Sequence, residues 1–244
     1  MARQYDPTRR KFFTRSLGAV PAVALAGTGL GRMGDAIARD REPQRGDESL
    51  SAYTPGYFQD DEWAFLLAAC DRLIPAEEAG AGALAANVPV FIDRQMQTPY
   101  GEGGLWYMQG PFHTNESPQL GYQLKFTPRE TYRTGIADVQ QYCRDTFDGK
   151  PFQSLTEEEQ IGVLTDLEKG RIALPNIPAS SFFQLLWTNT REGYLSDPQY
   201  GGNKDMAGWK AVGFPGARAD FMDWIEQPDR TYPLGPVPIH PRRG

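Results

Sequence analysis

Histidine and cysteine are scarce in this sequence, and their scarcity excludes several kinds of cofactor site. The 244 residues contain two histidines, His113 and His240, and two cysteines. No Cys-x-x-Cys-His motif occurs, so covalent attachment of haem c is excluded. Two thiols are too few for an iron–sulfur cluster, which normally takes four. A single histidine without a surrounding Cys, Asp or Glu cluster is a poor metal site, so we interpret His113 as a hydrogen-bonded loop residue.

The sequence also lacks the motifs of common enzyme classes. It has no Gly-x-Ser-x-Gly elbow, and only His113 could serve a Ser-His-Asp triad. The run Gly201-Gly202-Asn203-Lys204 has neither P-loop nor dinucleotide-binding spacing, and no strand pattern precedes it. A formal net charge of −6 argues against a nucleic-acid partner. We therefore expect no catalytic, cofactor-binding or metal-binding residues in this chain.

A long hydrophobic run is missing as well, but the N-terminus carries a recognisable export pattern. Arg9 and Arg10 stand just before Phe12 and Phe13, and a moderately apolar run follows over 17–30. That run is shorter than the ~20 apolar residues of a membrane span. The pattern resembles a twin-arginine translocation signal, which exports proteins already folded. The alternatives are a basic, disordered arm or a leader that is retained as an uncleaved anchor.

A cleavage site for this leader is predicted at Ala36-Ile37-Ala38, where Ala36 and Ala38 supply the small-x-small pattern. Residues 1–38 hold six basic and two acidic residues, a net charge of +4. Their removal would take the chain from −6 to −10, so the exported protein would be distinctly acidic. Residues 39–57 contain few apolar groups and are interpreted as a flexible extension.

Helical periodicity and capping signals predict an all-α fold over 58–226. Thr127 and Thr156 each begin a capping box, with glutamate three residues later. Helices are expected at about 59–74, 87–96 with Asn87 as its cap, 127–148, 156–170, 178–194 and from about 216 onward. The fifth is apolar nearly all round, which is typical of a central helix. We expect a single irregular domain of about six helices with long Gly/Pro/aromatic-rich loops, and an extended tail over 227–244.

Two loops are rich in aromatic residues. Residues 97–126 lack periodicity, and a loop of this length inside a compact domain tends to be functional. Residues 197–217 contain five glycines and three large aromatics, so we expect an ordered loop rather than a regular helix. Its three interpretations are a packed structural loop, a docking surface for another protein and, least favoured, a phosphate cradle. The docking candidates are Tyr200, Gly201, Gly202, Trp209, Phe214 and Pro215.

The two cysteines, Cys70 and Cys143, both fall on apolar faces of predicted helices. In an oxidising compartment a disulfide between them would persist. Two separate buried thiols are the alternative, and a bridge to a partner subunit is the third. Nucleophilic roles are disfavoured because buried thiols are inert.

Several segments in order resemble the small subunit of gluconate 2-dehydrogenase. Besides the leader, they are Asp71-Arg72-Leu73-Ile74-Pro75, Phe91-Ile92-Asp93-Arg94-Gln95, Pro99-Tyr100-Gly101, Gly149-Lys150-Pro151-Phe152, Tyr200-Gly201-Gly202-Asn203, Gly208-Trp209 and Gly213-Phe214-Pro215-Gly216. The resemblance covers most of 58–226, and related small subunits serve fructose, sorbitol and glucose dehydrogenases.

The resemblance implies a non-catalytic subunit of a periplasmic complex associated with the membrane. Its implied partners are a large flavoprotein subunit that holds FAD, a multi-haem cytochrome c subunit and the twin-arginine translocase. In that family the small subunit carries the export signal for the flavoprotein, which has none. The alternative is a stand-alone periplasmic enzyme or ligand-binding protein that uses its aromatic loops as a pocket.

Overall fold

Six α-helices make up the fold in the computed structural model, which describes residues 49–78, 80–113, 116–218, 221–227, 230 and 232–240. They are α2 (Asp60–Leu73), α3 (Val88–Met96), α4 (Pro128–Thr146), α5 (Glu157–Glu168), α6 (Ala179–Leu195) and α7 (Ala207–Val212). The described residues contain no strand, only two isolated β-bridges. The all-α prediction is therefore confirmed. The predicted signal and cleavage site lie outside the described residues.

Local capping explains where the best-predicted helices begin. The Thr127 hydroxyl accepts a hydrogen bond from the Glu130 amide, and the Glu130 carboxylate accepts one from the Thr127 amide at 2.8 Å. Thr156 and Glu159 repeat this exchange at the start of α5. Both predicted capping boxes are confirmed. Asn87 is the N-cap residue of α3, as predicted, but its backbone is left-handed and its side chain makes no capping hydrogen bond, so only the position of the cap is confirmed.

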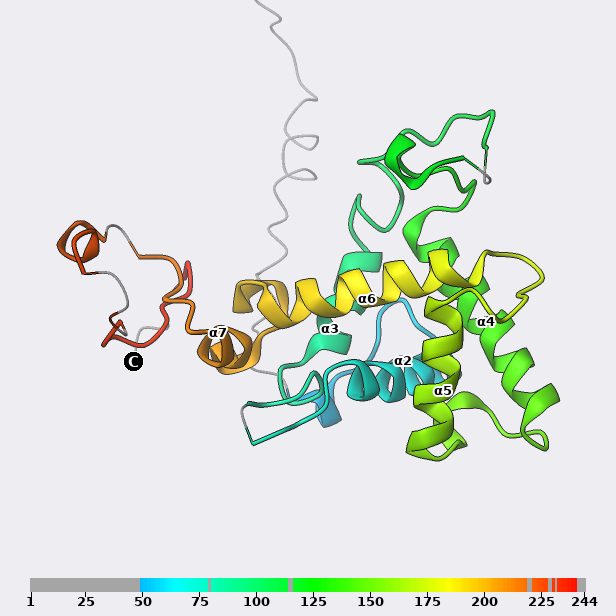
Figure 1. The fold of residues 1–244 in the computed structure, drawn as a ribbon, viewed down its shortest axis with the longest axis horizontal. Helices are drawn as coiled ribbons and strands as arrows, with labels where there is room; N and C mark the ends of the chain where they lie inside the picture. The colour runs from blue at the N-terminus through cyan, green and yellow to red at the C-terminus, as the bar shows by residue number, and fades with distance from the viewer. Residues whose placement is uncertain are drawn as a thin grey trace, which may run out of the picture. The chain divides into compact units, whose positions relative to one another are not determined.

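Helix α6 is central, as Figure 1 shows in yellow, and contacts α2, α3, α4, α5 and α7. Its Phe182 is fully buried beside Phe65 of α2, with ring centroids 6.2 Å apart. Gly135 of α4 admits this ring, since a Cβ there would lie 2.2 Å from it. The prediction that α6 is apolar nearly all round was wrong, because Gln184 and Arg191 lie exposed on its outer face.

A buried carboxylate, Asp93, fastens the start of the described chain to α3. Asp93 is fully buried. Its two oxygens accept hydrogen bonds at 2.7–3.1 Å from Tyr53 Oη, Gly56 N, Tyr57 N, Phe58 N and Gln97 Nε2. Such charge-assisted bonds are the strong ones in proteins. The predicted flexible extension therefore ends earlier than 57, because residues 53–57 are held by this cage.

The last helix forms earlier than predicted. Helix α7 lies inside residues 197–217, the glycine-rich loop, and Gly213 ends the helix in a left-handed conformation. From Gly216 onward there is no α-helix among the described residues, only a short 3-10 turn at Met222–Trp224. The reason is tertiary: Gly216 pairs with Val237 as an isolated bridge, and Trp224 packs against Tyr232 at 5.1 Å instead of entering the core.

Both cysteines are free and fully buried, so neither pairs with the other and neither is exposed to a partner. Cys70 Sγ lies 3.8 Å from the Thr190 hydroxyl of α6. Burial raises the pKa of each thiol to about 12. Of the three alternatives for the cysteines, the structure has two separate buried thiols. The predicted disulfide is absent because Cys70 packs toward α6. No helix in the described part of the chain combines the length and apolarity needed to cross a membrane.

Candidate partner-docking site

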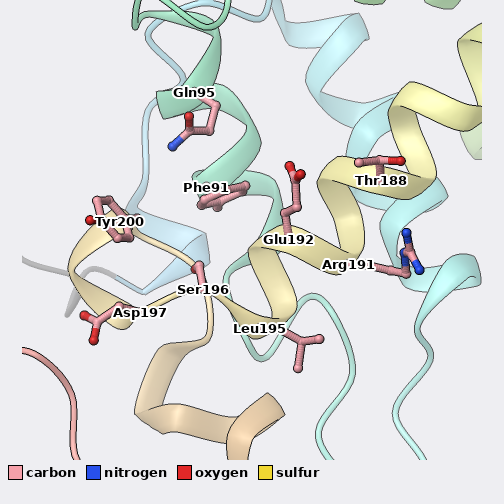
Figure 2. Close-up of a pocket in the computed structure, with 9 residues that line it drawn as sticks. All are labelled: Phe91, Gln95, Thr188, Arg191, Glu192, Leu195, Ser196, Asp197 and Tyr200. Carbon is pink, nitrogen blue, oxygen red and sulfur yellow. The ribbon is translucent and has the colours of Figure 1, made fainter. Parts of the chain in front are cut away.

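An open groove of about 610 Å³ lies where the end of α6 meets α3 and the start of the glycine-rich loop. It is lined by Phe91, Gln95, Thr188, Arg191, Glu192, Leu195, Ser196, Asp197 and Tyr200. Figure 2 shows Phe91 between Tyr200 on one side and Glu192 on the other. Helix α3 thus provides the apolar floor, and α6 and the loop provide the two walls.

The loop is held in place because its inner side caps α6. The last carbonyls of a helix have no partner within the helix and need one elsewhere. Leu195 O accepts from the Trp209 indole at 2.7 Å, and Ser196 O accepts from the Asn203 side-chain amide at 2.8 Å. The Asn203 side-chain oxygen also accepts from Gly208 N at 2.8 Å. One fully buried asparagine therefore joins the end of α6 to the start of α7.

Two glycines allow this close approach. A Cβ on Gly202 would lie 2.2 Å from Gly193 O, and one on Gly208 would lie 2.0 Å from Tyr194 O. Neither separation is sterically tolerable, so only glycine fits at these two positions without movement of the backbone. The interpretation of this segment as a packed structural loop holds for its inner side.

The outer side of the loop exposes a different set of residues. Tyr200 is 51% and Phe214 47% exposed, and Pro215 is half-buried. Gly201 and Gly202 are buried, and Trp209 is only 6% exposed. We therefore correct the docking set: Trp209, Gly201 and Gly202 serve the chain's own packing, and Tyr200, Phe214 and Pro215 remain available to a partner.

The charged groups of the groove are engaged within the chain. Asp197 accepts hydrogen bonds from Gln199 N at 3.1 Å and from Ile239 N, in the C-terminal segment, at 2.7 Å. Glu192 accepts one from Asn189 Nδ2 at 3.0 Å. Both carboxylates thus help to shape the groove.

Asn189 links the groove to the core through two tyrosines. Its side chain donates to Tyr100 Oη at 2.8 Å and accepts from Tyr132 Oη at 3.1 Å. Burial raises the pKa of both tyrosines, so both hydroxyls stay protonated at neutral pH. This network and the Asp93 cage were not predicted. The sequence did contain one indication of each: a polar residue, Asn189 or Asp93, stands among the apolar positions of a predicted helix.

The aromatic loop over 97–126 forms a second pocket of about 630 Å³. Trp106 packs between Tyr100 and Tyr122, whereas Tyr107 is 78% exposed. His113 is exposed, and its backbone amide donates to Gln123 Oε1 at 3.4 Å. Within the described ranges, no three His, Cys, Asp or Glu residues come together in a way that could hold a metal ion.

The fold and this groove define an all-helical protein whose open site borders a tightly packed glycine-rich loop. A family model, gluconate 2-dehydrogenase subunit 3, matches residues 60–216. The chain belongs to this family, whose members are accessory subunits of a dehydrogenase complex. No curated protein and no solved structure matches the chain.

Proposed function

We propose that this chain is the non-catalytic small subunit of an FAD-dependent dehydrogenase complex of the gluconate 2-dehydrogenase type. It docks and stabilises a large flavoprotein subunit that holds FAD, and a multi-haem cytochrome c subunit completes the complex at the periplasmic side of the membrane. Family membership over 60–216 is the observation that carries this proposal.

The groove beside Tyr200 supports the proposal because it suits a macromolecular partner. Tyr200 and Leu195 are 51% and 45% exposed at its edge, and the aromatic ring of Phe91 forms its floor. Interfaces are enriched in aromatic anchors at their centres. The loop that carries Tyr200 is tied to the end of α6 by hydrogen bonds from Asn203 and Trp209. A preorganised surface loses less conformational entropy on binding than a mobile one.

Export is the second part of the proposal. Arg9 and Arg10 with the apolar run that follows would direct the folded chain to the twin-arginine translocase. A flavoprotein without a leader would cross with this chain while bound to it. FAD is lost from an unfolded chain, so transport of the folded pair retains the cofactor. An interface that survives transport needs roughly 1,200–2,000 Å² of buried surface or more.

The test is cell fractionation of a strain in which this chain carries Arg9→Lys and Arg10→Lys. Both subunits are expected to remain in the cytoplasm, with the flavoprotein folded and FAD bound. A matched control, Arg3→Lys, changes an arginine outside the pair and is expected to leave export normal. Arrival of the flavoprotein in the periplasm in normal amount with the double variant would contradict the export role.

The second candidate function is a stand-alone ligand-binding protein or enzyme that uses the pocket over 97–126. Its aromatic lining, with Trp106, Tyr107, Phe112 and Tyr122, is the observation that favours it. This function predicts a purified chain that is monomeric, stable alone and responsive to a small ligand. Dependence of the chain on a flavoprotein for stability would instead favour the accessory subunit.

A further inference from the structure

The C-terminal half of α3 has two separate contacts. On one side, Phe91 and Gln95 line the groove. On the other, Asp93 holds residues 53–58 through the hydrogen-bonded cage. These residues span the end of the predicted extension, 39–57, and the first residue of the predicted helical domain. One short stretch of helix therefore supports both the groove and this N-terminal segment of the body.

Arg94 lies between these two contacts. Its guanidinium carbon is 5.7 Å from the centroid of the Tyr53 ring, whose hydroxyl donates to Asp93 at 2.7 Å. On its other side Arg94 packs against Gly201, where a Cβ would lie 2.8 Å from Nη1 and 3.0 Å from Cδ. Gly201 has a φ of +99°, so it holds the turn that presents Tyr200 to the groove. Tyr53, Arg94 and Gly201 form a continuous stack.

We propose that this stack couples residues 53–58 to the groove, so that docking of the flavoprotein on the Tyr200 groove makes opening of residues 53–58 from Asp93 rarer. The inference rests on the proposed function, because it takes the FAD-containing subunit as the occupant. A partner seated against Tyr200 and Gln95 restricts the Gly201 turn and, through it, the Arg94 side chain. A restrained Arg94 holds the Tyr53 ring in place and lowers the frequency with which the segment opens.

Thermodynamic reciprocity makes the coupling measurable from either side. If docking stabilises the anchored segment, then loss of the anchor weakens docking by the same factor.

The experiment is hydrogen exchange, followed by mass spectrometry, at the amides of Gly56, Tyr57 and Phe58 in the full chain. Exchange is measured alone and with flavoprotein at saturating concentration. We expect the flavoprotein to slow exchange at these amides about 10-fold, in the range typical of coupled sites. The variant Arg94→Ala, also at saturation, is expected to lose most of that slowing. The control Arg171→Ala removes an exposed ion pair with Asp166 and should retain it.

Asp93→Asn tests the reverse direction and should weaken flavoprotein binding by a similar factor. Because that variant can also destabilise the fold, the Arg94→Ala comparison decides the question. Equal slowing in Arg94→Ala and the unaltered chain would overturn the role of the stack. Binding without any slowing in the unaltered chain would overturn the coupling and leave the proposed function intact, and failure of the flavoprotein to bind would overturn both.

Discussion

Trp209 lies on the packed inner side of the glycine-rich loop and not on its exposed outer side. It is 6% exposed, and its indole donates to Leu195 O at 2.7 Å. Replacement by alanine leaves a cavity and an unpartnered carbonyl, so Trp209→Ala should lower the unfolding free energy by about 3–5 kcal/mol. Urea unfolding measures this loss, and Phe214→Ala, at a side chain 47% exposed, should cost clearly less. A Trp209→Ala variant of normal stability that fails to bind a partner would contradict this assignment.

The two cysteines carry a prediction about pH. Burial raises the pKa of both thiols from 9.0 to about 12, so the folded state keeps its protons where the unfolded state loses them. Their contribution to stability is therefore complete below pH 9 and is lost as the pH rises from 9 toward 12. The buried tyrosines, with raised pKa values, act in the same direction.

Thiol reactivity tests the burial of the two cysteines separately from that of the tyrosines. At pH 8 a thiol reagent should label neither cysteine in the folded chain and both in urea, because the thiolate is the reactive form and both side chains are fully buried. The check is the mass of the labelled protein with and without denaturant. Rapid labelling of either residue in the folded chain, or an intact disulfide in unreduced protein, would contradict the structure.

At the residue scale the sequence could not separate Tyr200 from Trp209. Both are aromatic residues beside glycines, and the directions of their side chains depend on the left-handed backbone at Gly201 and Asn203. Asp93 stands out as a polar residue among apolar helix positions, but its partners were hidden, because four of its five donors come from residues 53–58, more than thirty positions away in the chain. Such long-range polar contacts leave no periodic signal in a single sequence.

At the scale of elements, a pair of glycine substitutions tests the packing of the loop on α6. Gly202→Ala would place a Cβ 2.2 Å from Gly193 O, so the loop must shift, and stability should fall by about 2 kcal/mol or more. Gly162, inside α5, has nothing within 4 Å of its Cβ position. Gly162→Ala should therefore raise stability by about 0.4–1 kcal/mol. Thermal or urea unfolding of both variants gives the comparison, and equal effects of the two would contradict the packing described.

Elements with local signals were predictable, and those set by tertiary contacts were not. The capping boxes at Thr127 and Thr156 fixed the starts of α4 and α5. Helix α7 was missed because Gly208, which disfavours a helix, lies in its first turn. In the structure the Asn203 side-chain oxygen accepts a hydrogen bond from the Gly208 amide in that turn. The helix expected from Gly216 does not form because that glycine, with φ at +76°, pairs with Val237.

At the scale of the whole molecule, the family match covers the helical body, residues 60–216, and excludes both ends of the chain. The fold and family were recoverable from sequence because ordered motifs such as Pro99-Tyr100-Gly101 lie within that body. The exposed residues of the glycine-rich loop were predictable only in part, since Tyr200 and Phe214 are exposed but Trp209 is not. The proposal on which the others depend is that the flavoprotein docks on the Tyr200 groove.

That claim is tested most directly by the affinity of the purified FAD-containing subunit for two matched tyrosine variants. Tyr200→Ala removes a side chain 51% exposed at the groove, and Tyr107→Ala removes one 78% exposed on the other aromatic loop. Both variants should remain folded by circular dichroism. Tyr200→Ala should weaken binding by about 2 kcal/mol, roughly 30-fold, because exposed aromatic side chains are frequent anchors of interfaces. Tyr107→Ala should leave binding unchanged. Unaltered affinity in Tyr200→Ala, or a loss confined to Tyr107→Ala, would contradict the account.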